Sequence, residues 1–321
     1  MASSPATLGV EEELFLVDPD TWELAPGVER ILGPPGLKTE LFSCFVETNT
    51  GVCRDAHEAL AELTALRRVV REAAGREGLA YGAAGAHPFA VSGEQEIVQE
   101  PRYLALLAER PKAHRQLVCG LHVHVGCESL ERSIERLEAI LPWLPAVLAL
   151  SVNSPYLDGE EGALSGRAGR LLELPRAGAP PLLAGDGWER AVAASGGDYT
   201  LNWWDARPHP KLGTLEVRVA DQQTSVRRTA ALAALVQALV AAAEPREPYD
   251  RDAYAEARLA ASHGDAAADE LLALIEPAAR ELGTWELVGE LRAPPEAHHQ
   301  LAVGRRDGLV AVAADVAART A

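Results

Sequence analysis

The stretch Leu201–Gln223, LNWWDARPHPKLGTLEVRVADQQ, decides the fold of this chain. Apolar and polar residues alternate through its second half, Thr214–Asp221, with Leu215, Val217 and Val219 on one face. A period of two is typical of a strand that rests one face on a core. The other face carries Glu216 and Arg218, an acid beside a fixed cation, which suits a site that holds a metal ion and a phosphoryl group together. A solvated strand face with a cross-strand ion pair would give the same pattern.

Two acids share one face of another expected strand, Leu8–Val17, LGVEEELFLV. Glu11 and Glu13 are two residues apart, so a strand points both side chains the same way. Glu12 falls on the opposite face among apolar residues, where an acid must snorkel, pair or lie near the strand end. Adjacent acids repel each other and a divalent cation would relieve that repulsion, although a frayed acidic strand start explains the run as well.

Histidines and a further acid occur in the same arrangement on two more expected strands. In Leu117–Cys127, LVCGLHVHVGC, the side chains of His122 and His124 share one face. Two imidazoles at this spacing converge on one point, which is a common metal-binding geometry and also a frequent accident in β-proteins. Leu41–Val52 is expected to be a strand that carries Glu47. Four such strands favour one common site, and oxygen-rich ligands favour Mg2+ or Mn2+ over Zn2+.

Composition limits the class of protein. The 321 residues are 48% hydrophobic and carry a formal net charge of −17, which fits a globular protein and argues against nucleic acid and anionic membrane surfaces as partners. The beginning of the chain shows no signal-peptide pattern, and no apolar run is long enough to span a bilayer. The four cysteines, Cys44, Cys53, Cys119 and Cys127, lie apart and form no C-x-x-C pair, which predicts reduced thiols in a cytoplasmic protein.

Segments with helical periodicity lie between and after the expected strands. The expected helices are Ala56–Glu77, Pro101–Glu109, Glu131–Leu150 and Ser225–Ala243, and Leu79–Ala86 is expected to be a further strand. Ser151–Asp198, rich in Gly, Pro and Arg, is expected to be a substrate loop or a surface excursion. We expect a catalytic sheet-and-helix domain over residues 1–243, a linker over 244–252, and a helical segment over 253–321 packed on the same domain. The Rossmann and P-loop glycine motifs are absent, so any use of ATP relies on another design.

Several motifs in the same order resemble the carboxylate-amine ligase family, the bacterial proteins called glutamate–cysteine ligase type 2. They are the run Gly9–Glu13 with Asp18-Pro19, GLHVHVG at Gly120–Gly126, SVNSP at Ser151–Pro155 and WWDARPHPKLGTLEVRVAD at Trp203–Asp221. The resemblance extends over about residues 8–243. It implies an α+β fold similar to the catalytic part of glutamine synthetase. In that fold a curved antiparallel sheet holds ATP and metal ions on its concave face, and helices pack on its convex face.

The chemistry that this resemblance implies is ATP-dependent amide formation. The side-chain carboxylate of glutamate attacks the γ-phosphate of ATP and gives an acyl phosphate, and the amino group of cysteine or another amine then displaces phosphate. A zinc metallohydrolase that uses His122 and His124 is one alternative. A non-catalytic relative that binds a nucleotide or an amino acid is another. The resemblance also suggests a homodimer.

Residue roles follow from matching positions to the family's motifs. The implied metal ligands are Glu11, Glu13, Glu47, His122 and Glu216. Arg218 matches the arginine that faces the transferred phosphoryl group, and Arg167 looks like a loop arginine that grips a substrate carboxylate. The remaining candidates for substrate or ATP binding are Arg207, His122, His124 and Trp204, where Trp204 and its neighbour Trp203 either wall the site or pack in the core.

The chain departs from the family's pattern in three places. YAEARLAASHGDAAADELLALI, after the linker, keeps little of an Asn/Arg-rich helix opening. Gly166 stands where an aromatic residue is common, and the loop Asp158–Arg170 is shortened. These departures concern the pocket of the second substrate and remove no implied metal ligand.

Overall fold

The fold is α+β and is built on an antiparallel sheet. The computed structural model describes residues 6–245 and 249–320, and within these ranges the main sheet has seven strands. Six strands follow the order β10-β11-β5-β1-β3-β2, and β4 pairs with the far half of β1. The strands are β1 (Leu8–Val17), β2 (Leu37–Thr39), β3 (Phe45–Asn49), β4 (Ala80–Gly82), β5 (Leu121–Gly126), β10 (Ala206–His209) and β11 (Thr214–Val217). The fold class expected from the sequence is therefore confirmed.

The strand register places the acidic and imidazole side chains beside one another. Glu11 of β1 pairs with His122 of β5, and Glu216 of β11 pairs with His124. On the other side of β1, Glu13 pairs with Glu47 of β3. Paired residues on adjacent strands point to the same face, so these six side chains share one face of the sheet. Alternation along each strand sets this face, because a shift of the strand register by one residue would turn these side chains to the opposite face of the sheet.

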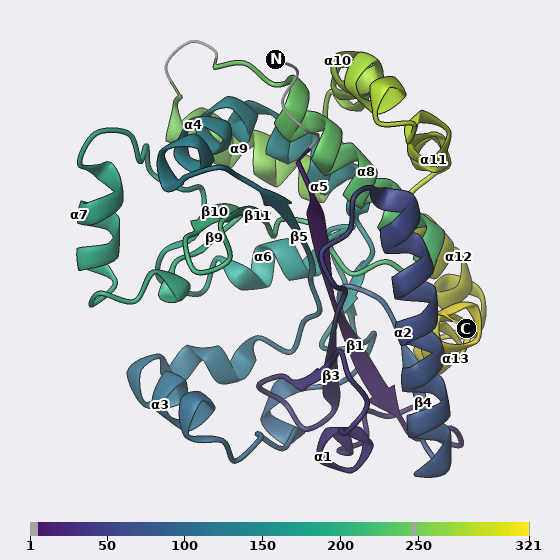
Figure 1. Ribbon diagram of the computed structural model, residues 1–321. Helices are drawn as coiled ribbons and strands as arrows, with labels where there is room; N and C mark the ends of the chain where they lie inside the picture. Colours follow the sequence, from purple (N-terminus) through teal and green to yellow (C-terminus); the bar gives the residue numbers. More distant parts are fainter. Residues whose placement is uncertain (1–5, 246–248, 321) are drawn as a thin grey trace.

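The opposite face of the sheet carries the apolar half of each alternation and is covered by helices. Helices α2 (Ala56–Arg76) and α8 (Val226–Ala242) pack on this face against β1 and β5. In Figure 1, α2 and α8 lie on one side of β1, and α3 (Pro101–Glu109), α6 (Gly166–Leu171) and α7 (Gly187–Ala194) lie on the other. The side chains that carry the chemistry therefore face away from the main helical layer.

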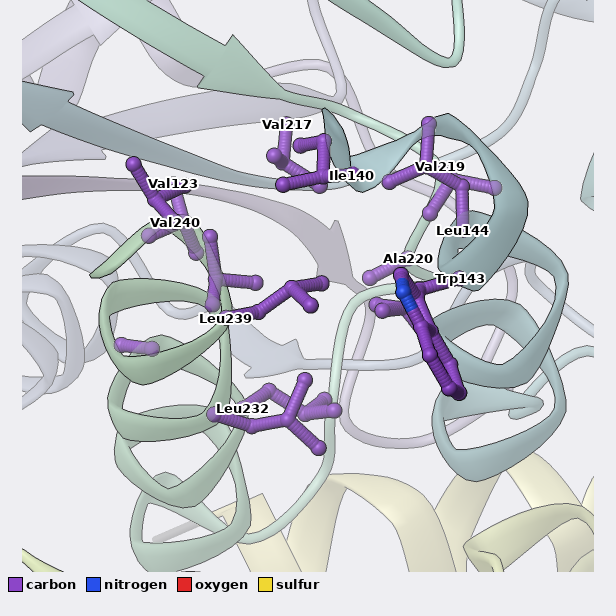
Figure 2. Packing of buried hydrophobic residues seen from close by; sticks show 14 of the residues in the cluster. Val123, Ile140, Trp143, Leu144, Val217, Val219, Ala220, Leu232, Leu239 and Val240 are labelled. Atoms are coloured by element: carbon purple, nitrogen blue, oxygen red, sulfur yellow. The ribbon is translucent and has the colours of Figure 1, made fainter. Parts of the chain in front are cut away.

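The larger hydrophobic core lies between the sheet and α8. Figure 2 shows Val123 and Val217 of the sheet packed with Leu239 and Val240 of α8, and Ile140 closing the cluster. All five are almost fully buried. Burial of an aliphatic side chain of this size contributes about 1.5–3 kcal/mol, so this layer holds the strands in the register that forms the site.

The remaining helices have the bounds that capping residues and prolines dictate. Asp55 caps α2 by accepting hydrogen bonds from the N–H groups of His57 and Glu58. The expected helix Glu131–Leu150 is divided at Pro142 into two helices joined by a 3₁₀ turn. The others are α1 (Val28–Ile31), α4 (Leu130–Ile140), α5 (Leu144–Ser151), α9 (Arg251–Ser262), α10 (Ala268–Glu281), α11 (Trp285–Val288), α12 (Glu296–Asp307) and α13 (Leu309–Thr320).

Two expectations about elements were wrong in detail. The expected strand Leu41–Val52 is only Phe45–Asn49, and the buried residues Leu41–Cys44 before it form a turn after β2. The segment Ser151–Asp198 is not a continuous loop. It contains α6, α7 and the short strands β6 (Tyr156–Leu157), β7 (Glu160–Glu161) and β8 (Ala177–Gly178), and β8 pairs in parallel with β9 (Trp203–Trp204). Buried polar contacts order this segment, and helical or strand periodicity does not reveal such contacts.

The C-terminal helices pack on the rest of the chain. Helix α10 lies against α8, and α13 lies against β4. Residues 246–248, in the middle of the expected linker, lie outside the described residues, and α9 begins at Arg251. Within the described ranges, none of the helices combines the length and apolar character needed to cross a membrane.

Candidate active site

The centre of the candidate site is formed by Glu11, His124 and Glu216, one residue from each of three adjacent strands. One ligand atom from each of these residues lies within 4.8 Å of the other two. Glu11 Oε1 is 3.6 Å from His124 Nε2, and Glu216 Oε1 is 4.0 Å from the same nitrogen. Two carboxylates and an imidazole at this spacing form a donor set that a divalent cation can bridge.

His124 presents one nitrogen to this centre because its other nitrogen is occupied. Its Nδ1 lies 2.9 Å from the hydroxyl of Thr214, within hydrogen-bond distance. Its Nε2 is buried and has no hydrogen bond to any described residue. A buried polar atom without a partner costs free energy, and a metal ion at the centre would supply the missing contact. The residues present therefore fit a metal ion.

His122 joins the centre to Glu13. Its Nδ1 is 3.3 Å from Glu11 Oε2, and its Nε2 is 3.7 Å from Glu13 Oε1. Glu13 is held in place by the backbone N–H of Gly120, which donates to its Oε2. Burial alone raises the pKa of Glu11, but the contact with the His122 ring and the nearby ring of His124 outweigh burial and hold that pKa well below the usual range. Glu11 is thus an anion that is ready to bind a cation.

Two arginines flank Glu216 and have different exposures. Arg207 is buried, and its Nε donates to Glu216 Oε2 at 2.7 Å, while its Nη1 donates to the carbonyls of Thr200 and Asn202. Arg218 donates to Glu216 Oε1 and keeps 20% of its side chain exposed. Burial raises the pKa of Glu216, and the charges of Arg207 and Arg218 more than reverse this and hold it well below the usual range. Arg207 is therefore placed to orient Glu216, and Arg218 is placed to meet a ligand.

Glu47 lies at the edge of the site and belongs to a second group of acids. It accepts from Asn49 Nδ2 at 2.9 Å and pairs with Lys38 at 3.4 Å. Glu40, which the sequence analysis did not single out, lies beside it. Burial and the nearby charges of Glu13 and Glu47 raise the pKa of Glu40 well above the usual range. In the structure Glu40 directly follows the short strand β2, and no pattern in the sequence marked it as a candidate.

Arg167 lies in the first turn of α6, close to His122. A Cβ atom on Gly120 would lie 2.3 Å from Arg167 Nη2 and 2.8 Å from His122 Nε2, so only glycine lets the two side chains approach this part of β5. Arg167 Nη1 and Nη2 donate to the carbonyls of Val219 and Arg218, and its Nε has no hydrogen-bond partner among the described residues. Arg167 is therefore brought to the site, with one bond from each Nη atom to a backbone carbonyl.

A buried carboxylate, Asp221, organises the turn that carries Arg167. Asp221 accepts from the backbone N–H of Asn153 and from the hydroxyls of Ser154 and Ser165, at 2.7–2.8 Å. Its carboxylate also lies 3.9 Å from Arg167 Nη1. The SVNSP motif thus provides ordering contacts for α6, and a Cβ on Gly85 would lie 2.6 Å from the Asp221 carboxyl carbon.

The structure separates the remaining candidates. Trp204 is buried in the main hydrophobic core, which favours packing over a role in walling the site. His209 was not singled out from the sequence as a candidate residue. It lies in β10, and its ring centroid is 5.5 Å from that of His124. Its short strand, interrupted by Pro208 and Pro210, gave too little periodicity to be recognised.

A large cavity opens onto the centre of the site. It has a volume of about 1290 Å3 and includes Glu11 and His124 among its lining residues. Its lining carries Lys38, Arg132 and Arg136 beside the acids Asp55, Glu128 and Glu281. The cavity is therefore large enough for a ligand the size of a nucleotide that reaches Glu11 and His124.

Comparison with known proteins identifies the family. The sequence profile of glutamate-cysteine ligase family 2 (GCS2) matches residues 7–300. A protein of Rubrobacter xylanophilus, provisionally named glutamate–cysteine ligase 2-3, is 40% identical, with 96% of this chain and 94% of the relative aligned. A second protein of that organism, provisionally named glutamate–cysteine ligase 2-1, is 39% identical over 78% of this chain and 72% of its own length.

Solved structures show the same fold at much lower identity. The glutamate–cysteine ligase of Francisella tularensis in complex with AMP matches with a TM-score of 0.74 and 14% identity, covering 99% of this chain and 88% of that protein. The bifunctional glutathione synthetase of Pasteurella multocida matches with a TM-score of 0.69 and 13% identity, covering 99% of this chain. This chain spans 52%, about half, of that protein's length. The comparisons give no support to the zinc metallohydrolase alternative. The chain belongs to glutamate-cysteine ligase family 2.

Proposed function

We propose that this protein is an ATP-dependent ligase that joins the side-chain carboxylate of glutamate to an amino group. One observation carries the proposal: a buried Glu11–His124–Glu216 donor set and the arginine Arg218 share one sheet face in a chain of this family. A site for acyl activation by ATP must neutralise phosphate charge and hold a carboxylate in line with the γ-phosphate. A metal-binding donor set beside a partly exposed guanidinium meets the first requirement.

The large cavity supports ATP as the nucleotide. Its volume of about 1290 Å3 can hold ATP, and the polyphosphate would lie at the end lined by Glu11 and His124, where a bound divalent cation would offset its charge. The Francisella relative was solved with AMP, which supports an adenine nucleotide for this fold without fixing its position in this chain.

Mg2+, with Mn2+ as an alternative, is the metal that this donor set would hold. Glu11, His124 and Glu216 would hold it at the centre, and Glu13, Glu47 and His122 are the further ligands implied by the resemblance. When bound, such an ion neutralises phosphate charge and polarises the transferred phosphoryl group. The chain's own part is to keep the ligands ionised, since His122 and His124 lower the pKa of Glu11 and the arginines lower that of Glu216.

The reaction balances as two displacements. An oxygen of the glutamate side-chain carboxylate attacks the γ-phosphorus, the bond to the bridging oxygen breaks, and ADP leaves. The amine nitrogen then attacks the acyl carbon, phosphate leaves, and the amine loses one proton. Arg218 would stabilise the charge on the phosphoryl group in both steps, and Arg207 would hold Glu216 in position. The buried surroundings of Glu216 limit the access of water, which would otherwise hydrolyse the acyl phosphate.

Cysteine is the second substrate that the names of the relatives favour. The cytoplasmic location and the homodimer suggested by the sequence are part of the same proposal. The location is supported by the four cysteines, which are free thiols in the structure.

The test is release of inorganic phosphate by the purified protein with Mg-ATP, glutamate and a panel of amino acids and amines. We expect release that needs both glutamate and one particular amine, and a product whose mass is the sum of the two substrates less one water. Binding of ATP without turnover would favour the non-catalytic relative. Failure to bind ATP would refute the proposed function.

A further inference from the structure

The guanidinium of one buried arginine outside the candidate site has no hydrogen-bond partner among the described residues. Arg110, the residue that follows α3, is only 4% exposed. Its Nε, Nη1 and Nη2 all lack hydrogen bonds to the described residues. The carboxylate of Glu109, 3.9 Å away, belongs to a side chain that is 56% exposed. A guanidinium has five N–H donors, so this is a large unmet demand for acceptors in a buried place.

Arg110 lies in a group with Trp203 and Arg176, which we call the Arg110 cluster. The guanidinium carbon of Arg110 is 5.8 Å from the centroid of the Trp203 ring. The backbone N–H of Trp203 donates to the carbonyl of Arg176 at 2.9 Å, which fixes these two residues side by side. The Nε of Arg176 is also buried and has no partner among the described residues. Burial lowers the pKa of Arg110, and the charge of Arg176 lowers it further.

Arg176 is only half-buried, and its Nη1 donates to the carbonyl of Ala194 at 3.1 Å. The buried charge of Arg110, which Arg176 repels, is costly unless an anion lies beside it. Asp198 is the other acid whose charge reaches Arg110. Its Oδ1 already accepts from the backbone N–H and hydroxyl of Thr200. The cluster therefore has the charge, the unused donors and the aromatic wall of a carboxylate-binding site, and no carboxylate among the described residues is hydrogen-bonded to Arg110.

The position of the cluster relates it to the candidate site. The segment after Arg110 packs on α6, because Arg170 Nη1 donates to the carbonyl of Arg115 and Gln116 Nε2 donates to the carbonyl of Arg170. Helix α6 also carries Arg167, which reaches His122 at the candidate site. In Figure 1, α3, α6 and β9 lie on the same side of β1. None of the three cluster residues lines the cavity assigned to ATP. The cluster therefore lies on the α6 side of the candidate site, outside the cavity assigned to the nucleotide.

We propose that the Arg110 cluster binds the carboxylate of an amino-acid substrate. The inference rests on the proposed function and adds a recognition site to it. Two substrates could supply the carboxylate: glutamate, through the carboxylate on its α-carbon, or the amino acid that provides the amine. Either one would displace no protein contact at Arg110, since no acceptor is bonded there.

The test compares matched substrates in the wild type and in Arg110→Met. One pair is glutamate and 4-aminobutyrate, which lacks the α-carboxylate, and the other is cysteine and cysteamine, which lacks a carboxylate. In the wild type we expect kcat/KM to favour the carboxylated member of one pair. In Arg110→Met we expect this preference to fall at least tenfold, mainly through a higher KM, and only for that pair. The pair that is affected identifies the substrate whose carboxylate the cluster binds. Unchanged preferences for both pairs would overturn the inference.

Arg102→Met is the control. Arg102 also lies on α3 and also stacks on an aromatic ring, at 4.4 Å from the centroid of Tyr103, but its side chain is 57% exposed and pairs with Glu100. We expect it to leave both preferences unchanged.

The thermal stability of the ligand-free protein separates a binding role from a structural one. Methionine fills a similar volume without an unpaired charge, so Arg110→Met should have a Tm equal to or higher than that of the wild type. A lower Tm with unchanged preferences would show a structural arginine. If the wild type turns over no amine, the proposed function fails, and calorimetric titration with glutamate and with cysteine then tests the Arg110 cluster by itself. Loss of amino-acid binding in Arg110→Met would support the cluster as a binding site. Equal binding in the wild type and in Arg110→Met would overturn the inference.

Discussion

Glu216 is held between two guanidiniums inside the protein, and this determines what its substitution does. Only 1% of its side chain is exposed, and Arg207 behind it is also buried. From the sequence alone, Glu216 and Arg218 could both be changed without unfolding the protein. Burial modifies that expectation for Glu216, because removal of one partner from a buried ion pair leaves the other uncompensated.

We therefore predict that Glu216→Gln abolishes turnover and also lowers the free energy of unfolding by about 3–5 kcal/mol, the range for breaking a buried pair. Arg218→Ala should abolish turnover with a smaller loss of stability, because 20% of the Arg218 side chain is exposed and Arg207 still pairs with Glu216. Urea denaturation and phosphate release measure the two effects. Near-normal turnover in either variant would show that the assignment of β11 to the site is wrong.

Thr214 determines which nitrogen of His124 is available to a metal ion. We predict that Thr214→Val, which removes the hydroxyl 2.9 Å from Nδ1, weakens Mn2+ binding by about 10–100-fold, the usual effect of losing such an outer contact. Thr214→Ser keeps the hydroxyl and should bind Mn2+ like the wild type. Calorimetric titration with Mn2+ in the absence of ATP and amino acids measures the affinity directly. Equal affinities in the valine and serine variants would contradict this role.

The sequence predicted individual residues best where alternation assigned them a face. Glu11, Glu216 and the two histidines were placed together because their neighbours along each strand are apolar. Glu12 could not be explained from the sequence, because its partner Arg67 is 55 residues away on α2 and donates to it at 2.5 and 3.0 Å. Arg110 was not recognised either, since lack of a partner is a property of the folded state.

At the scale of elements, local patterns identified the long strands and helices and failed in Ser151–Asp198. That segment is ordered by contacts with residues far away in sequence, such as the hydroxyls of Ser154 and Ser165 on Asp221. Serines in a Gly- and Pro-rich stretch carry no periodic signal, so the same residues suggest a loop when read alone. The segment could be predicted only as a connection, and its two helices could not.

The turn after β4 contains a histidine that links this turn to the segment after β1. His87 Nε2 lies 2.9 Å from the carbonyl of Trp22, and its Nδ1 accepts from the backbone N–H of Ala90 at 3.2 Å. Burial lowers the pKa of His87 from 6.5 to about 4. The folded state therefore disfavours the imidazolium, whereas the unfolded chain takes up the proton near pH 6.5.

We predict that stability falls as the pH drops from 6.5 to about 4, because the unfolded state binds more protons in that window. The shift in pKa corresponds to a loss of up to about 3 kcal/mol. His87→Gln cannot titrate and should show a flatter dependence of unfolding free energy on pH between these limits. Urea denaturation across the window checks this. Parallel curves for wild type and variant would mean that other groups cause the loss.

At the scale of the whole molecule, the C-terminal segment is joined to the catalytic part by buried polar contacts. Arg258 donates to Asp205 at 2.7 and 3.1 Å, and Tyr254 donates to the same carboxylate at 2.8 Å. Glu296 accepts from the backbone N–H groups of Thr224 and Ser225 at the beginning of α8. The sequence predicted a separate helical segment on the same domain, but not these contacts, because each joins residues about 50–72 positions apart.

We predict that a chain ending at residue 245 does not fold stably. Removal of the later helices would leave Asp205 without Arg258 and Tyr254, and it would expose the face of α8 that packs on α10. Each uncompensated buried charge costs about 3–5 kcal/mol, which is comparable to much of the stability of a typical domain. Circular dichroism and thermal unfolding of the shortened chain, beside Arg258→Met in the full chain, measure the effect. A shortened chain with a cooperative transition at the wild-type Tm would show that residues 6–245 fold alone, and the coupling between α9 and the loop at Asp205 would then serve the site and not the fold.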